Sequence, residues 1–328
     1  MLTDKTKLLR RKFLFRRSSG TKAQSKGFFS EIYLNRYLYA LAVPGMLFLI
    51  IFAYVPMSGH LLAFKDYSVI KGIFRSSWSG LENFKFFFGS PDWLRVTFNT
   101  IFLNGLFIVF GLSLAILIAL FLNEIKSLTI KKFSQSIIFL PYFISWMAVS
   151  FMLYSLLNTS DGLINRVLLS VGVEKLQWYN EAGYWRAILT IIYVWKQAGY
   201  YSIIFLAAIT GISSEQYEAA TIDGANRFQQ IIHITLPLIS PTVIILALLA
   251  VGRIFYGDFG MIYSLVGDNG ALLPTTDVID TFSYRALRQL GNFSMASAVV
   301  LYQAVMGMVT IIIFNSISKR IDPESGLF

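Results

Sequence analysis

Few residues of this 328-residue chain could catalyse a reaction. The sequence has no cysteine, which excludes thiol nucleophiles, disulfides and cysteine metal sites, and its two histidines leave little for imidazole chemistry. The dipeptide Gly-Lys does not occur, so a phosphate-binding loop of the G-x-x-x-x-G-K-S/T type is also excluded. Asp277 and Asp280 could pair as catalytic carboxylates, but no suitable base lies near them and we expect a solvated loop there. If nucleotide energy drives this protein, another chain must bind the nucleotide.

The most informative polar segment lies within residues 213–241. Ser213 and Gln216 have the spacing of a capping box, which predicts the start of a helix. Gly224 follows about ten residues later and predicts the end of that helix, because glycine enters the left-handed conformation without a steric cost. A second helix can begin at Asn226 and run into the next apolar segment. We therefore expect a short helix, a glycine bend and another short helix between two membrane spans.

The elements that position this segment are apolar helices. The chain is 55% apolar and 14% charged, against roughly 25% charged residues in soluble domains, so it is a membrane protein. A helix needs about 20 apolar residues to cross a bilayer. Lys196 and Arg253 interrupt two of the six stretches that approach this length. We predict an all-α membrane protein with six transmembrane helices, at residues 37–59, 98–122, 133–160, 187–214, 234–256 and 293–317.

The distribution of basic residues predicts how the spans are oriented. Residues 1–36 contain ten Lys or Arg against two acidic residues, directly before an apolar run. This is typical of a cytoplasmic tail attracted to anionic lipid headgroups, and we favour membrane lipids over nucleic acid as its partner. Sixteen basic residues fall on the side of the N-terminus and ten on the other. We expect a multi-pass protein with both termini cytoplasmic, including residues 318–328, and an extracytoplasmic segment at residues 61–97.

The order of residues in the polar segment resembles the signature loop of type I importer permeases of ATP-binding cassette (ABC) transporters. That loop reads Glu-Ala-Ala, three residues, Gly, about nine residues, then Ile-x-Leu-Pro. The matching residues here are Glu218, Ala219, Ala220, Gly224, Ile234, Leu236 and Pro237. Asp223, Ala225, Phe228 and Pro241 add the form of the carbohydrate-uptake, maltose-type branch.

The resemblance covers roughly residues 37–320. The segment from Tyr39 to Tyr67, with Pro44-Gly45 and Val55-Pro56-Met57, looks like the start of permeases in the polysaccharide and oligosaccharide importer subgroup. Gly80-Leu81-Glu82-Asn83-Phe84, followed by Asn99-Thr100, is similar to the segment before their second span. Only the basic tail is left without a counterpart.

The resemblance implies a type I permease fold, with a five-helix core at residues 98–317 and a cytoplasmic coupling loop at residues 213–237. It implies a bacterial cytoplasmic membrane, a second homologous permease, and a separate ATPase dimer that binds ATP and Mg, with no cofactor in this chain. An extracytoplasmic sugar-binding protein would contact segments 61–97, 161–186 and 257–292. In such a loop, small alanines let the backbone of a partner protein approach closely, acidic side chains pair with basic groups of the partner, and a phenylalanine fills a pocket on its surface. The coupling residues are then Glu218, Ala219, Ala220, Asp223, Gly224, Ala225, Arg227 and Phe228.

Charges inside spans indicate a candidate substrate path, because they are costly in a bilayer. Aromatic faces with nearby hydrogen-bonding groups suit sugars, although Tyr and Trp also collect at the bilayer interface or pack between helices. The candidate path residues are Tyr193, Lys196, Gln197, Tyr200, Arg253 and Tyr256. An ion pair between Arg253 and Asp258 is the alternative for that region. Asn104, Trp146 and Asn315 could face either the path or neighbouring helices.

Two other functions fit the composition less well. An ion-coupled secondary carrier needs intramembrane carboxylates or broken helices, and no predicted span has an Asp or Glu in its interior. A membrane-embedded enzyme acting on lipid-linked sugars needs a metal or acid–base cluster, which the histidine and cysteine counts disfavour. The prediction is a permease subunit of an ATP-driven importer of sugars, with oligosaccharides as the expected substrates.

Overall fold

The computed structural model describes residues 34–321, mostly as helices, and the predicted basic tail lies outside this range except for its last residues. The chain divides after Ser58 into two units. The first contains α3 (Arg36–Leu49), the π-helical turn η1 (Ile50–Tyr54) and α4 (Val55–Met57). Its apolar side chains are exposed, as expected of a helix that faces lipid, and it matches the predicted first span.

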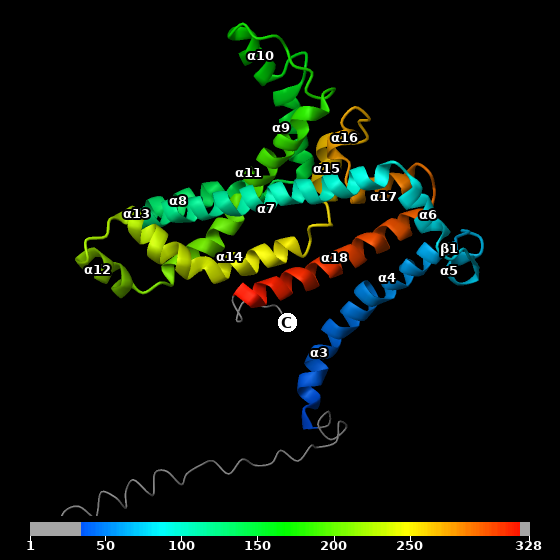
Figure 1. The fold of residues 1–328 in the computed structure, drawn as a ribbon, viewed down its shortest axis with the longest axis horizontal. Coiled ribbons are helices and arrows are strands. Elements are labelled where there is room, and N and C mark those ends of the chain that lie inside the picture. The colour runs from blue at the N-terminus through cyan, green and yellow to red at the C-terminus, as the bar shows by residue number, and fades with distance from the viewer. Residues whose placement is uncertain (1–33, 322–328) are drawn as a thin grey trace, which may run out of the picture. The chain divides into compact units, whose positions relative to one another are not determined.

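The second unit contains long helices joined by short ones and a two-stranded antiparallel ribbon (Figure 1). The remaining elements are, in chain order, η2 (Ser58–Phe64), β1 (Lys65–Asp66), α5 (Gly72–Arg75), β2 (Ser77–Trp78), α6 (Glu82–Gly89), α7 (Asp92–Glu124), α8 (Leu128–Phe139), η3 (Leu140–Phe143), α9 (Trp146–Leu157), α10 (Leu163–Ser170), η4 (Ala182–Tyr184), α11 (Trp185–Thr210), α12 (Ser214–Ile222), α13 (Arg227–Gln230), η5 (Ile231–Thr235), α14 (Leu236–Val251), α15 (Phe259–Val266), α16 (Leu273–Thr276), α17 (Ile279–Arg288) and α18 (Phe293–Ile321).

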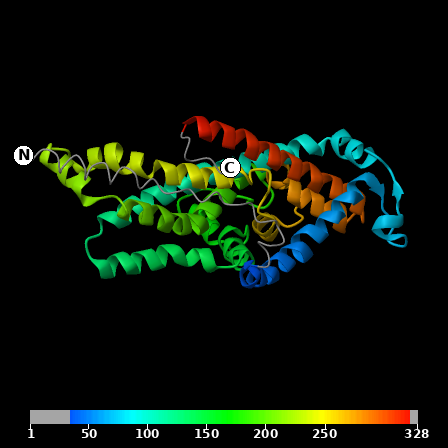
Figure 2. The same ribbon diagram turned by 90° about the horizontal axis from the view of Figure 1, so that it is seen from below.

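The core of this unit lies along the contact between α7 and α11 (Figures 1 and 2). Ala115 and Ala119 on α7 and Ala198 on α11 are almost fully buried, and such small residues let two helices approach closely. A second apolar cluster joins the same two helices to α9 and α15. The α7–α11 pair is therefore the frame on which the polar segments at the two ends of the unit are held.

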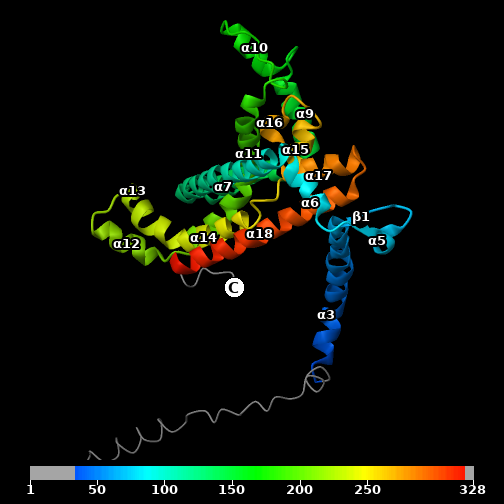
Figure 3. The ribbon, with the colours of Figure 1, turned by 45° about the vertical axis from the view of Figure 1, so that its right-hand side comes forward.

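The predicted span 133–160 is not one straight helix. Its two halves, α8 with η3 and then α9, meet at a bend of 95°, and Figure 3 shows α9 leading away to α10. Pro141 lies in η3, where proline lacks a backbone donor and disfavours a continuing helix. Ser145 then starts α9, because its side chain accepts a hydrogen bond from the Ala148 N–H at 3.2 Å. The expectation of a continuous span was wrong: the regular α8 helix ends before Pro141, and the chain is extended at Ile144 and Ser145, where the bend lies.

The number of spans depends on how two segments are counted. Among the described residues, four helices are long and apolar enough to cross a membrane, or five if the bent pair is one span. The predicted fourth span corresponds to α11, which has 26 residues but carries Lys196 and Gln197 in its middle. The all-α membrane fold is confirmed, and the predicted count of six is reached only when α11 is included.

The expectation of a solvated loop at Asp277 and Asp280 is wrong for both carboxylates. Asp277 is 1% exposed and forms an ion pair with Arg285. Asp280 accepts a hydrogen bond from the Gly257 N–H at 2.6 Å, and burial raises the pKa of this carboxyl. The segment folds back through α15, α16 and α17 onto α7 and α18, so it buries polar residues that its sequence places between spans.

Candidate functional site

The segment predicted to dock a partner forms an elbow of two short helices, which we define as residues 213–237 (Figure 1). Ser213 caps α12 with its side chain, as the sequence predicts. Gly224 has a φ of +81°, the left-handed conformation that favours glycine. The Ala225 N–H donates to the Ala220 carbonyl at 2.9 Å, which closes α12 in the pattern typical of a glycine-terminated helix. The predicted helix and glycine bend are therefore present.

The second arm of the elbow begins after Asn226, also as predicted. A capping box occurs here: the Gln229 N–H donates to the Asn226 side chain at 2.9 Å, and the Asn226 N–H donates to the Gln229 side chain at 2.8 Å. The box predicted between Ser213 and Gln216 does not form, because the Ser213 hydroxyl accepts instead from the Glu215 N–H. Both arms nevertheless start at a side-chain cap.

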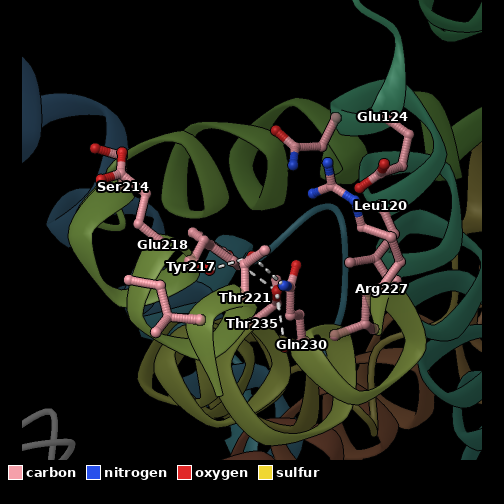
Figure 4. A pocket seen from close by; sticks show the side chains of 12 residues that line it. Leu120, Glu124, Ser214, Tyr217, Glu218, Thr221, Arg227, Gln230 and Thr235 are labelled. Atoms are coloured by element: carbon pink, nitrogen blue, oxygen red, sulfur yellow. Dashed lines mark hydrogen bonds between the residues drawn. The ribbon is translucent and has the colours of Figure 1, made fainter. Parts of the chain in front are cut away.

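Side-chain hydrogen bonds join the two arms (Figure 4). The Tyr217 hydroxyl on α12 lies 2.9 Å from the Thr235 hydroxyl on η5. The Gln230 amide, on a residue that is 5% exposed, donates to the Thr221 hydroxyl at 3.0 Å. A cavity of about 580 Å³ lies between these residues and the end of α7. The elbow is thus braced and suited to moving as one piece.

The outer surface of the elbow offers both charge and apolar area. Phe228 is 70% exposed, and Glu218, Asp223 and Arg227 are exposed without an ion pair to any described residue. The alanines of the motif, Ala219, Ala220 and Ala225, are exposed or partly exposed. Ile222 is 86% exposed and was missed by the sequence reasoning, although an apolar residue directly before a helix end was a usable signal. Such a surface has the components of a protein-docking site.

A second candidate site is a cavity of about 490 Å³ between α7, α11 and the chain after α14, which we call the aromatic cavity. Its volume lies in the range of small-molecule sites. Five of the six predicted path residues line it, namely Tyr193, Gln197, Tyr200, Arg253 and Tyr256. The other lining residues are Asn104, Phe107, Ile108, Tyr142, Tyr201, Ala250, Gly257, Asp258 and Phe259. Of the three polar residues left open by the sequence, Asn104 lines the cavity and Trp146 and Asn315 do not.

The aromatic walls of this cavity are held by stacking. Tyr193 stacks on Phe107 with ring centroids 4.3 Å apart, and Tyr200 stacks on Tyr142 at 4.8 Å. These contacts fix aromatic rings beside amide and guanidinium groups. The combination can contact the apolar C–H faces of a sugar and hydrogen-bond to its hydroxyls.

Lys196, the sixth predicted path residue, does not line the cavity. Its ammonium donates to the backbone carbonyls of Tyr142 at 2.6 Å and Pro141 at 3.2 Å. It also lies 5.1 Å from the ring centroid of Trp146. The ammonium therefore binds carbonyls at the break between α8 and α9, where the regular helical hydrogen bonds stop. Lys196 holds this bend in position next to the cavity.

The alternative ion pair between Arg253 and Asp258 is not formed among the described residues. One Asp258 oxygen accepts from the Met261 N–H at 2.9 Å and caps α15. The other accepts from the Trp146 indole N–H at 3.1 Å. Asp258 is therefore committed to holding α15 against α9, and Arg253 forms no ion pair with residues 34–321.

These features define a class of protein. A membrane transport component is indicated by the apolar membrane-spanning helices, the elbow between two of them and the polar-aromatic cavity. Residues 34–321 contain no group of three or more His, Cys, Asp or Glu placed to hold a metal ion. The chain belongs to the family of binding-protein-dependent transport system inner membrane components, which it matches over residues 108–323. It is a transport subunit of an ABC system and not an enzyme, as predicted.

Relatives of known name agree with this family. The chain is 37% identical to Protein LplB of Bacillus subtilis, over 90% of this chain and 92% of LplB. It is 34% identical to the polygalacturonan/rhamnogalacturonan transport system permease protein YteP of the same organism, over 92% and 94% of the two chains. It is also similar to a chain in the crystal structure of a bacterial alginate ABC transporter with an alginate pentasaccharide-bound periplasmic protein. That match has a TM-score of 0.82 and 34% identity, and covers 90% of this chain and 98% of the other.

Proposed function

We propose that this chain is a permease subunit of an ATP-driven importer of sugars, specifically oligosaccharides, and that its elbow couples transport to a separate ATPase. The observation that carries the proposal is the elbow itself, a braced pair of helices with an exposed Phe228, Glu218 and Asp223. ATP-driven movement reaches membrane helices only through an element that transmits it without bending. The names of the relatives support saccharides as the class of substrate.

The coupling proposal assigns roles to the predicted residues of the elbow. Phe228 and Ile222 fill an apolar depression on the ATPase, and the exposed charges pair with its basic and acidic groups. Gly224 sets the angle between the two arms through its left-handed conformation. The docking residues are Glu218, Ala219, Ala220, Ile222, Asp223, Gly224, Ala225, Arg227 and Phe228. The ATPase binds ATP and Mg, and the elbow and both termini then lie in the cytoplasm.

Two further partners complete the proposed importer. A second homologous permease packs against this one to close the translocation path. An extracytoplasmic sugar-binding protein delivers the substrate to segments 61–97, 161–186 and 257–292. The path passes through the aromatic cavity, where Tyr193, Gln197, Tyr200, Arg253 and Tyr256 contact the sugar. Lys196 acts on the path indirectly, by fixing the bend that carries Tyr142.

Reconstitution tests this function. The chain is purified with its co-assembling subunits, placed in proteoliposomes, and assayed for sugar uptake with ATP supplied on the ATPase side. We expect uptake that requires both ATP and the binding protein. Glu218→Lys should abolish stimulation of ATP hydrolysis by the binding protein, whereas Lys132→Glu, at an exposed lysine outside both the elbow and the three binding-protein segments, should not. Uptake driven by an ion gradient without any ATPase would overturn the proposal in favour of a secondary carrier.

A further inference from the structure

The aromatic cavity is lined by two charged side chains, Arg253 and Asp258, which differ in how their hydrogen-bonding groups are satisfied. Arg253 lines the cavity, is exposed to it, and forms no ion pair with any residue from 34 to 321. The carboxylate of Asp258 also lines the cavity, but each of its oxygens already accepts a hydrogen bond. The ammonium of Lys196 is engaged by two backbone carbonyls. Among the described residues, Arg253 is thus the charged group of the cavity wall whose hydrogen-bonding groups have no partner.

A lone guanidinium in such a wall has a specific binding chemistry. Its planar N–H groups match the two oxygens of a carboxylate, and the resulting paired hydrogen bonds are among the stronger ones in proteins. The half-buried Gln197 also lines the cavity, and its amide has no hydrogen-bond partner among the described residues. The stacked rings of Tyr200 and Tyr142 add flat apolar surface. The wall therefore combines contacts for an anion, for hydroxyls and for a sugar face.

We propose that the aromatic cavity takes saccharides that carry a carboxylate, and that Arg253 is the residue that selects for this group. The proposal rests on the proposed transport of sugars and adds the charge of the substrate. A carboxylate is favoured over a phosphate because the single positive charge of Arg253 matches a monoanion, whereas a doubly charged phosphate would keep one uncompensated negative charge beside Asp258. Arg253 acts by direct contact with the substrate, not through another residue.

The test compares sugars that differ only in charge. The probes are the dimer of galacturonate and its carboxyl-reduced neutral counterpart, with glucose 6-phosphate and glucose as a second pair. Dissociation constants are measured on the complete permease–ATPase complex in nanodiscs without binding protein, so that only the permease selects. Arg253→Gln removes the positive charge, and Arg253→Lys keeps the charge but removes the paired N–H groups of the guanidinium. Arg288→Gln removes an exposed charge that lies outside the cavity.

We expect the wild-type complex to bind the galacturonate dimer about ten- to a hundredfold more tightly than the neutral dimer, the range for a charged hydrogen-bonded pair. Arg253→Gln should remove this preference by weakening binding of the acidic dimer much more than binding of the neutral dimer, Arg253→Lys should keep part of the preference, and Arg288→Gln should keep all of it. Added salt should weaken binding of the acidic dimer and leave binding of the neutral dimer unchanged. A wild-type complex without preference for the carboxylate, or with a greater preference for the phosphate, would overturn the proposal, as would equal weakening of both dimers in Arg253→Gln.

The wild-type comparison decides the question even if a variant fails to assemble. ATP-driven uptake of any sugar by the same complex tests the proposed function separately. An importer that carries only neutral sugars would leave the transport function intact and refute the role of Arg253.

Discussion

Substitution of Gly224 tests whether the shape of the elbow controls coupling. Nothing lies within 4 Å of a Cβ added at this position, so a larger side chain causes no collision. The cost comes from the φ of +81°, which an ordinary residue adopts at about 1–2 kcal/mol. Such a penalty lowers the population of the native elbow by a factor of about 5–30. Asparagine tolerates this conformation better than alanine, and a β-branched valine tolerates it worst.

The assay is the stimulation of ATP hydrolysis by the binding protein in proteoliposomes, measured together with sugar uptake. We expect coupling to fall in the order wild type, Gly224→Asn, Gly224→Ala and Gly224→Val, with the permease still inserted and assembled. Gly211→Ala is the matched control, because Gly211 lies at the start of the same loop with a φ of −80° and room for a methyl group. Wild-type coupling in Gly224→Val, or an equal loss in Gly211→Ala, would refute the reasoning.

Three further substitutions test the supports of the fold. Lys196→Met leaves two backbone carbonyls at the helix break without their donor, so we expect a loss of about 1–3 kcal/mol in thermal unfolding and a raised KM for sugar, with Lys196→Arg partly restoring both. Asp277→Asn breaks a buried ion pair and should cost about 3–5 kcal/mol, whereas Glu82→Gln, at an exposed pair outside this network, should leave thermal unfolding nearly unchanged. Burial raises the pKa of Asp280 above its ordinary value of 3.8, so its protonated form stabilises the folded state. That stabilisation is present at low pH and is lost as pH rises through the folded-state pKa. Asp280→Asn should therefore flatten the fall in Tm with rising pH over this window.

The sequence predicted the features that depend on local chemistry. Four of the six apolar spans, the glycine bend at Gly224 and the helix start after Asn226 follow from residue type and spacing, and the structure has them. Five of six path residues meet in one cavity because a charge or an aromatic polar group inside a span must face something other than lipid.

The features that depend on long-range packing were not predictable. Asp277 and Asp280 look like loop residues, but Asp277 is buried and Asp280 is half-buried because α17 folds back onto other helices. Lys196 was indistinguishable in sequence from a residue that touches substrate, since its carbonyl partners lie more than fifty residues earlier in the chain.

The break that follows Pro141 was predictable in principle, because the proline stands inside an otherwise unbroken apolar run.

Cross-linking tests most directly whether the elbow binds an ATPase. The chain has no cysteine, so Phe228→Cys places one thiol on the exposed face of the elbow, and Leu290→Cys places one on an exposed loop after α17. A thiol–amine reagent is applied to the assembled complex, and the linked chains are identified. We predict a link from residue 228 to the ATPase, at a yield that changes on ATP binding, and none from residue 290. A link to the ATPase from residue 290 and not from residue 228 would contradict the account.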